Sequence, residues 1–185
     1  MDESLRELIE KARAGNKNAF ATLVQRFQNR ILSVAYGVID NQQDAEDIAQ
    51  ETFIKAYNSI GKLNHVEGFY KWLLRIAVNT SINYKKNAVS TPKVPIDEIN
   101  KLISQGETPE EYVEKREGIK KLGAVLAELT PEYRAILVLR EIEGLSYDEI
   151  ANLFAIPLGT VKSRINHARE KLRQGLTRGE KNEMF

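Results

Sequence analysis

Apolar residues recur at intervals of three and four along most of this chain, and no stretch alternates with period two for long. This pattern predicts an all-α protein. In the N-terminal half we expect helices over residues 5–12, 19–35, 44–59 and 69–86, with a break at Gly15 and Asn18 as the cap of the second helix. Asn41 to Gln43 should form the turn before the third helix, and residues 61–68 a polar loop. In the C-terminal half we expect helices over about 110–129, 131–144, 146–154 and 158–175.

The pattern changes at residue 87. Residues 87–110 contain Pro92, Pro95 and Pro109 but few large apolar side chains. Because proline disfavours helix in the residue before it, the pattern predicts an extended linker here. The sequence therefore predicts two small helical domains, residues 1–86 and 111–176, joined by the linker 87–110 and followed by a C-terminal tail, 177–185.

Composition excludes several classes of site. The chain has no cysteine, and His65 and His167 lie far apart in sequence, so neither a disulfide, a metal centre nor a bound cofactor is expected. No apolar run approaches membrane-spanning length, and the N-terminus has no apolar signal segment. We expect a cytoplasmic protein that does not itself insert into a membrane.

Charge is distributed unevenly, although the net charge is only +1. Residues 40–51 hold five acids and no base, giving −5, whereas residues 160–178 hold six bases against Glu170, giving +5. Segments of opposite charge suggest partners of opposite character.

The basic segment belongs to a predicted helix-turn-helix, LSYDEIANLFAIPLGTVKSRINHAREKL. Ser146 and Glu149 have the spacing of a capping box. In the second helix Val161, Ile165, Ala168 and Leu172 form the inward stripe, so the polar residues fall on other faces. Those able to read base edges are Lys162, Ser163, Asn166 and His167, with Thr160 at the helix start, and Arg164, Arg169 and Arg173 could reach phosphates. The alternative is a helical hairpin with a solvated basic face, and a helix-turn-helix alone would fit many repressors and response regulators equally well.

The fourth helix, FYKWLLRIAVNTSINYKKN, interleaves aromatic residues with basic and amide side chains. Its inward stripe would run from Phe69 through Trp72 to Thr80. The other faces carry Lys71, Arg75, Asn79, Asn83, Lys85 and Lys86. Such a surface is typical of proteins that bind single-stranded or distorted DNA, but periodicity alone allows a buried aromatic helix with an incidentally basic back.

Three segments together resemble one family. DAEDIAQETFIKAY, WLLRIAVNTSINY and LTPEYRAILVLREIEGLSYDEIANLFAIPLGTVKSRINHAREKL are similar, in this order, to the extracytoplasmic-function (group IV) sigma factors of the sigma-70 family, and most to the subgroup that answers envelope stress. The resemblance implies that residues 1–86 form a sigma-2 domain that binds core RNA polymerase and reads and melts the −10 promoter element. It implies that residues 111–176 form a sigma-4 domain that reads the −35 element.

The resemblance also assigns residues to partners. The acidic segment DAEDIAQETF would contact the clamp of the largest polymerase subunit through Asp47, Gln50, Glu51 and Glu46. The first three of these lie at i, i+3 and i+4, on one side of a helix, and their acids would repel DNA, which favours a protein partner. Ordinary solvated charge is the alternative. The −10 element would be contacted by Asn79, Leu63, Lys55, Arg75, Asn83 and Lys86, and the −35 element by Lys162, Ser163, Arg164, Asn166, His167, Arg169 and Thr160.

The remaining implied partners are the flap of the second-largest polymerase subunit and an anti-sigma factor, and the linker would thread toward the RNA exit path. The chain departs from the family pattern in the loop from Lys62 to His65, and at His167, where relatives often have arginine. Base preference at both elements is therefore left open.

Two other functions are possible alternatives. A stand-alone helix-turn-helix regulator with a helical sensing domain would bind duplex DNA tightly without polymerase. A hydrolase or nuclease is disfavoured, because the sequence has no nucleophile–base arrangement, no phosphate-binding glycine loop and no converging carboxylate pair. We therefore expect that the protein is not an enzyme.

Overall fold

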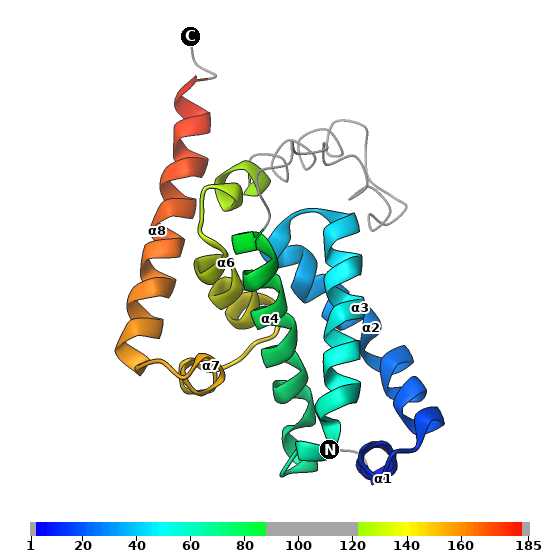
Figure 1. Cartoon of the computed structure of the whole chain (residues 1–185). Helices are drawn as coiled ribbons and strands as arrows, with labels where there is room; N and C mark the ends of the chain where they lie inside the picture. Colours follow the sequence, from blue (N-terminus) through cyan, green and yellow to red (C-terminus); the bar gives the residue numbers. More distant parts are fainter. Residues whose placement is uncertain (1–2, 88–121, 183–185) are drawn as a thin grey trace, which may run out of the picture.

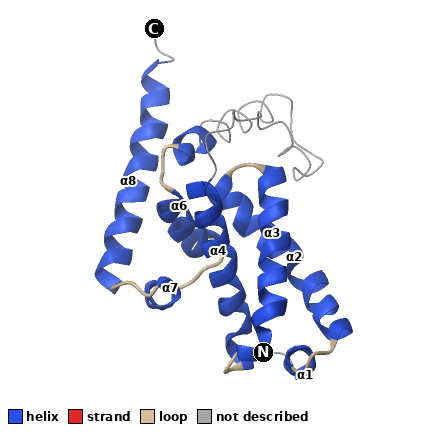
Figure 2. Cartoon of the chain, viewed as in Figure 1, coloured by secondary structure: helices blue, strands red, loops and turns tan. Residues whose placement is uncertain are grey.

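In a computed structural model of the chain, residues 3–87 and 122–182 are described, with only the backbone for 178–182. These two ranges contain helices and turns but no strand, so the predicted all-α class is confirmed (Figures 1 and 2). Most of the predicted linker, and the first part of the helix expected after it, lie outside the described residues.

The N-terminal half is a bundle of four helices: α1 (Glu3–Arg13), α2 (Lys17–Ile39), α3 (Gln42–Ser59) and α4 (Phe69–Asn87). The apolar stripe predicted for α2 is buried at Phe20, Leu23 and Phe27 and again from Ile31 to Ala35 at helical intervals. It packs against Ile48 of α3 and Leu73 of α4, both fully buried. The four helices therefore form as the periodicity predicts, because each has one apolar face to bury.

The helix starts differ from the predictions by two residues. Asn16, not Asn18, caps α2, with its side-chain oxygen accepting a hydrogen bond from the Ala19 amide at 3.0 Å. Asn41 caps α3 by accepting from the Asp44 amide at 2.9 Å, so Gln42 and Gln43 are helical and the turn consists of Asp40 and Asn41. Both corrections have the same cause: the residue before each cap, Gly15 or Asp40, has a left-handed backbone that places the following asparagine at the helix entrance.

The loop between α3 and α4 is more ordered than predicted. It contains two short 3₁₀ turns, η1 (Ile60–Lys62) and η2 (Val66–Gly68). Ile60, Leu63 and Val66 are buried under these turns, whereas Asn64 and His65 are exposed.

The C-terminal half begins with helical residues 122–127, followed by α6 (Pro131–Leu137), η4 (Val138–Ile142), α7 (Tyr147–Phe154) and α8 (Leu158–Asn182). The helix predicted over 131–144 changes at Val138 into a π-helical turn, which ends with the Glu143 amide donating to the Val138 carbonyl at 3.1 Å. The last helix continues beyond the predicted residue 175 to Asn182.

The two halves pack against each other and share one hydrophobic core. This core runs from Ile9 in α1 through α4 to Ile136, Ile150 and Ile165 of the C-terminal half. In Figure 1, α6 lies beside α4. Because α4 is covered by α2 and α3 on one side and by the C-terminal half on another, Leu74, Val78 and Ile82 are buried in addition to most of the predicted stripe. Trp72 and Ile76 of that stripe are half-buried.

Candidate nucleic-acid surfaces and a protein-binding groove

The acidic helix α3 exposes its four predicted contact residues, Glu46, Asp47, Gln50 and Glu51. A fifth polar residue, Asp44, is tied down, because the Tyr84 hydroxyl of α4 donates to its carboxylate at 2.7 Å. This hydrogen bond is the first cause of a raised Tyr84 pKa, so the tyrosine stays neutral. Asp44 thus fixes α3 against α4 and leaves the other acids facing outward.

Beside these acids lies an apolar groove of about 510 Å³ between α2 and α3. Its floor includes Phe20, Leu32 and Phe53, and its rim carries Glu46 and Gln50. Asp47 and Glu51 do not line it. The structure therefore divides the predicted contact residues into a pair at the groove and a pair outside it, where Glu51 forms an ion pair with Lys55 at 2.7 Å.

Two further groove residues escaped the sequence reasoning. Ile54 is 54% exposed and Tyr57, which was predicted to face inward, is 42% exposed with its ring edge-on to Phe20 at 5.0 Å between centroids. Large apolar side chains exposed around a concave surface are typical of a protein-binding site. The sequence signal was the position of Ile54, an apolar residue outside the inward stripe of α3.

A basic and amide stripe follows one side of α4. Arg75, Asn79 and Asn83 are exposed at successive intervals of four, with Lys71 and Lys86 at its ends. Lys55 of α3 reaches this helix by donating to the Thr80 hydroxyl at 3.1 Å. The structure therefore brings together five of the six residues predicted to contact the −10 element: Asn79, Lys55, Arg75, Asn83 and Lys86.

Leu63, the sixth, is only 7% exposed and packs in the core beneath the loop. In this conformation it supports the exposed loop residues Asn64 and His65 and presents almost no surface of its own. The ends of the stripe are also occupied: Lys71 pairs with Glu149 and Lys86 with Glu132, each at 2.7 Å.

The helix-turn-helix geometry predicted for the C-terminal half is present. Ser146 caps α7 and its capping box with Glu149 is complete, with distances of 3.2 Å and 2.7 Å. Ala155 makes the turn in a left-handed conformation. In α8 Val161, Ile165 and Ala168 are buried, which leaves Lys162, Ser163, Asn166 and His167 on the exposed side near the N-terminal end of the helix.

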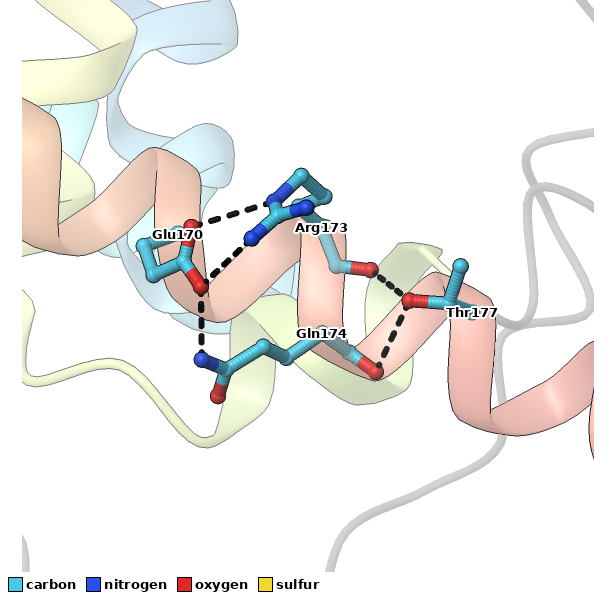
Figure 3. Close-up of polar contacts among 4 residues, drawn as sticks. All are labelled: Glu170, Arg173, Gln174 and Thr177. Atoms are coloured by element: carbon cyan, nitrogen blue, oxygen red, sulfur yellow. Dashed lines mark hydrogen bonds and ion pairs between the residues drawn. The ribbon is translucent and has the colours of Figure 1, made fainter.

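Other residues predicted to meet DNA have partners within the chain. Arg169 forms an ion pair with Glu141 at 2.7 Å, and the His167 ring lies 5.1 Å from that of Tyr133. Thr160 and Arg164 are half-buried. On the last turns of α8, Arg173 and Gln174 both donate to Glu170 (Figure 3), and the hydrogen bond from Arg173, followed by that from Gln174, lowers the pKa of Glu170. The acid therefore offsets the positive charge that Arg173 would offer a phosphate.

Within 3–87 and 122–182, no group of three or more acidic or histidine side chains is placed to hold a metal ion. In the same ranges no helix is both long and apolar enough to cross a membrane.

Two family models match the chain: sigma-70 region 2 over residues 23–91, and sigma-70 region 4 over residues 119–172. Among curated proteins, the chain is 35% identical to the RNA polymerase sigma-H factor of Pseudomonas aeruginosa over 182 residues, which cover 94% of both chains. It is 33% identical to the ECF RNA polymerase sigma factor SigW of Bacillus subtilis, covering 95% of this chain and 98% of SigW. The ECF RNA polymerase sigma-E factor of Escherichia coli K12 is 34% identical, covering 93% and 95%.

Two solved structures share the fold. The structure of CnrH in complex with the cytosolic domain of CnrY matches with a TM-score of 0.66 and 24% identity, covering 95% of this chain and 98% of CnrH. The sigma factor RpoE of Bartonella quintana, solved with the anti-sigma factor NepR, also has a TM-score of 0.66, with 20% identity and coverage of 85% and 96%.

Proposed function

This chain belongs to the extracytoplasmic-function sigma factors of the sigma-70 family, and we propose how its surfaces divide the work of a promoter-specificity subunit of RNA polymerase. The groove between α2 and α3 binds core polymerase, the stripe on α4 contacts the −10 element, and the N-terminal turns of α8 contact the −35 element. The single observation that carries this division is the groove, because it supplies an apolar protein-binding surface whose lining contains no basic residue.

The groove suits an α-helical partner of the polymerase clamp. Its floor offers apolar area to Ile or Leu side chains, and the carboxylate of Glu46 and the amide of Gln50 can pair with basic or polar residues on the same partner helix. Ile54 and Tyr57 extend the apolar contact. Asp47 and Glu51, outside the groove, add negative potential that favours encounter with a basic surface.

The stripe on α4 is the surface proposed for the −10 element. Asn79 and Asn83 supply amides that can hydrogen-bond to bases, and Arg75 and Lys55 supply charge for the backbone. Leu63 acts by holding the loop in place, so that Asn64 and His65 stay exposed to the promoter.

In the sigma-4 half, Lys162, Ser163 and Asn166 are the proposed base-reading residues, with Arg164 and Thr160 positioned beside them. His167 and Arg169 contribute to DNA binding only once their contacts with Tyr133 and Glu141 are exchanged for the promoter. We assign residues 1–86 and 111–176 to the two domains and residues 87–110 to the connecting linker.

The proposal has four further parts. An anti-sigma factor controls the protein, and the sigma-4 half binds the polymerase flap. The protein is cytoplasmic and acts in the response to envelope stress. In this role the protein binds core polymerase and positions it on promoter DNA, and it catalyses no reaction of its own.

The test compares two double lysine substitutions. Glu46→Lys with Gln50→Lys alters the groove rim, and Asp47→Lys with Glu51→Lys alters the outer acids. If the groove carries the contact, the rim variant should weaken binding to core polymerase by about tenfold or more, because like charges across an interface cost several kcal/mol, and the outer variant should mainly slow association.

Glu10→Lys on α1 is the matched control for a surface charge reversal. Binding is measured by titrating labelled protein with core polymerase, and promoter-specific run-off transcription should fall in parallel. Unchanged core binding in both double variants would remove the groove and the acidic helix from the proposed polymerase contact.

A further inference from the structure

Three basic residues form a line along one side of α8. Lys162, Arg169 and Arg173 are spaced by seven and four residues, so they lie on the same side of a helix with about 3.6 residues per turn, and all three are exposed. At about 1.5 Å per residue, Arg169 lies about 10 Å and Arg173 about 16 Å beyond Lys162 along the helix. The major groove is only about 12 Å wide. The two arginines therefore lie where α8 would leave the groove and meet the phosphates.

This line of positive charge is free only at its N-terminal end. Within residues 3–87 and 122–177, Lys162 forms no ion pair with an acid. Arg169 does, because its Nη2 atom lies 2.7 Å from Oε1 of Glu141 in η4, a residue 28 positions earlier in the chain. The contact with Glu141 thus neutralises the middle of the line.

The end of the line is neutralised from within α8. The Arg173 guanidinium donates to both carboxylate oxygens of Glu170, from Nε to Oε2 at 3.1 Å and from Nη2 to Oε1 at 2.9 Å (Figure 3). Gln174 donates to the same Oε1 at 2.7 Å. Arginine holds a phosphate with the same fork of two parallel donors. The Glu170 carboxylate therefore occupies the donors that a DNA phosphate would take.

Both ion pairs are firmly charged. The hydrogen bond to Glu141 raises the pKa of Arg169, and the hydrogen bond to Glu170 raises the pKa of Arg173. A phosphate can therefore gain these donors only by displacing a carboxylate ion.

Stability does not account for these pairs. The four side chains are 46–74% exposed, and exposed ion pairs contribute little to the free energy of unfolding. Their larger consequence is electrostatic, because they cancel two of the three positive charges along the side of α8 that the proposed function turns toward DNA.

We propose that Glu141 and Glu170 limit the affinity of the sigma-4 half for DNA phosphates by occupying the donors of Arg169 and Arg173. This role rests on the proposed binding of α8 to the −35 element. Phosphate contacts are the same for every DNA sequence, whereas contacts with base edges differ. The acids thus weaken binding that depends on phosphates alone and leave Lys162 free to contribute to base reading.

The test measures binding of the full chain to a mixed-sequence DNA duplex by fluorescence anisotropy. Glu141→Gln and Glu170→Gln keep the size of each side chain but remove its charge. Each should raise the affinity about threefold to tenfold at roughly 0.1 M salt, because the freed arginine adds one phosphate contact. The slope of log Kd against log salt concentration should also become steeper, by up to about one in each variant.

A double-mutant cycle shows whether the gain comes from the arginine. Glu141→Gln should add nothing in a chain that already carries Arg169→Gln, and Glu170→Gln should add nothing beside Arg173→Gln. The matched control is Asp148→Asn on α7, which removes the same charge from an exposed residue that has no basic partner among the described residues. It should leave the affinity nearly unchanged, and circular dichroism verifies that every variant is folded.

Equal affinities for Glu141→Gln, Glu170→Gln and Asp148→Asn would overturn the proposal, and so would gains that persist after the arginines are removed. Lys162→Gln tests the proposed function separately, because it should weaken duplex binding if α8 faces DNA. No effect of Lys162→Gln would count against the proposed −35 surface. A loss in Lys162→Gln without a gain in either glutamate variant would show that α8 binds DNA and that the two acids do not limit it.

Discussion

Glu149 shows how one side chain can serve two structural purposes. Its carboxylate completes the capping box of α7 and also pairs with Lys71 on α4. The hydrogen bond from Lys71, followed by those from Ser146, lowers the pKa of Glu149 from 4.5 to about 2. A single ionised group therefore supports both the helix-turn-helix and the contact between the halves.

This shift predicts a pH dependence of stability. Because the folded-state pKa lies below the unfolded one, ionised Glu149 stabilises the fold fully above about pH 4.5, and the contribution disappears as the pH falls toward about 2. The free energy of unfolding lost in Glu149→Gln should therefore be constant near neutral pH and shrink below about pH 4.5. Urea titrations followed by circular dichroism at several pH values measure this, with Asp148→Asn on the same turn as the control. A loss in Glu149→Gln that is the same at pH 3 and pH 7 would contradict the assignment.

Individual residues also show how much of the candidate site could be predicted from the sequence. Sequence spacing identified the exposed residues of α8 and the stripe on α4, because both follow from the position of one buried stripe. It missed the exposed Ile54 and Tyr57, because the groove they border is formed by α2 and α3 together and spacing within α3 carries no information about α2. Similarly, Leu63 was predicted at the DNA surface, but its burial depends on how the loop folds back on the core.

At the scale of elements, the close crossing of residues 122–127 over α8 predicts a contrast between two glycines. A Cβ at Gly175 would lie 2.4 Å from a methyl of Val125, whereas one at Gly159, in the same helix, would meet nothing within 4 Å. Gly175→Ala should therefore destabilise the fold by about 1–3 kcal/mol through overpacking. Gly159→Ala should be neutral or stabilising by up to about 1 kcal/mol, because alanine favours helix. The midpoints of chemical unfolding measure both, and equal effects would argue against the crossing.

The exact ends of the helices could not be predicted from local sequence patterns alone. The existence of the helices followed from apolar periodicity, but the choice of Asn16 over Asn18 as a cap depends on the left-handed turn at Gly15. The π-helical turn after Leu137 lies where Val138 packs on Gly37, a contact between residues about one hundred positions apart. The π-helical turn therefore depends on packing between the halves, which no short stretch of the sequence reveals.

At the scale of the whole molecule, the shared core predicts that the two halves unfold together. Trp72, the single tryptophan, lies in α4 and reports on the N-terminal half. Ile150 lies in α7 of the C-terminal half, is fully buried and belongs to the same hydrophobic cluster as α4. Ile150→Ala should lower the free energy of unfolding by about 2–5 kcal/mol. Because the packed halves stabilise each other, the urea midpoint seen by Trp72 fluorescence should fall together with the midpoint seen by circular dichroism.

Ile142→Ala provides the comparison for this last prediction, because Ile142 lies in the same half but is largely exposed, and neither midpoint should move. If Ile150→Ala lowers only the circular dichroism midpoint, the halves unfold independently and their contact contributes little to stability. A joint shift would instead mean that the contact between the halves contributes to the stability of both of them.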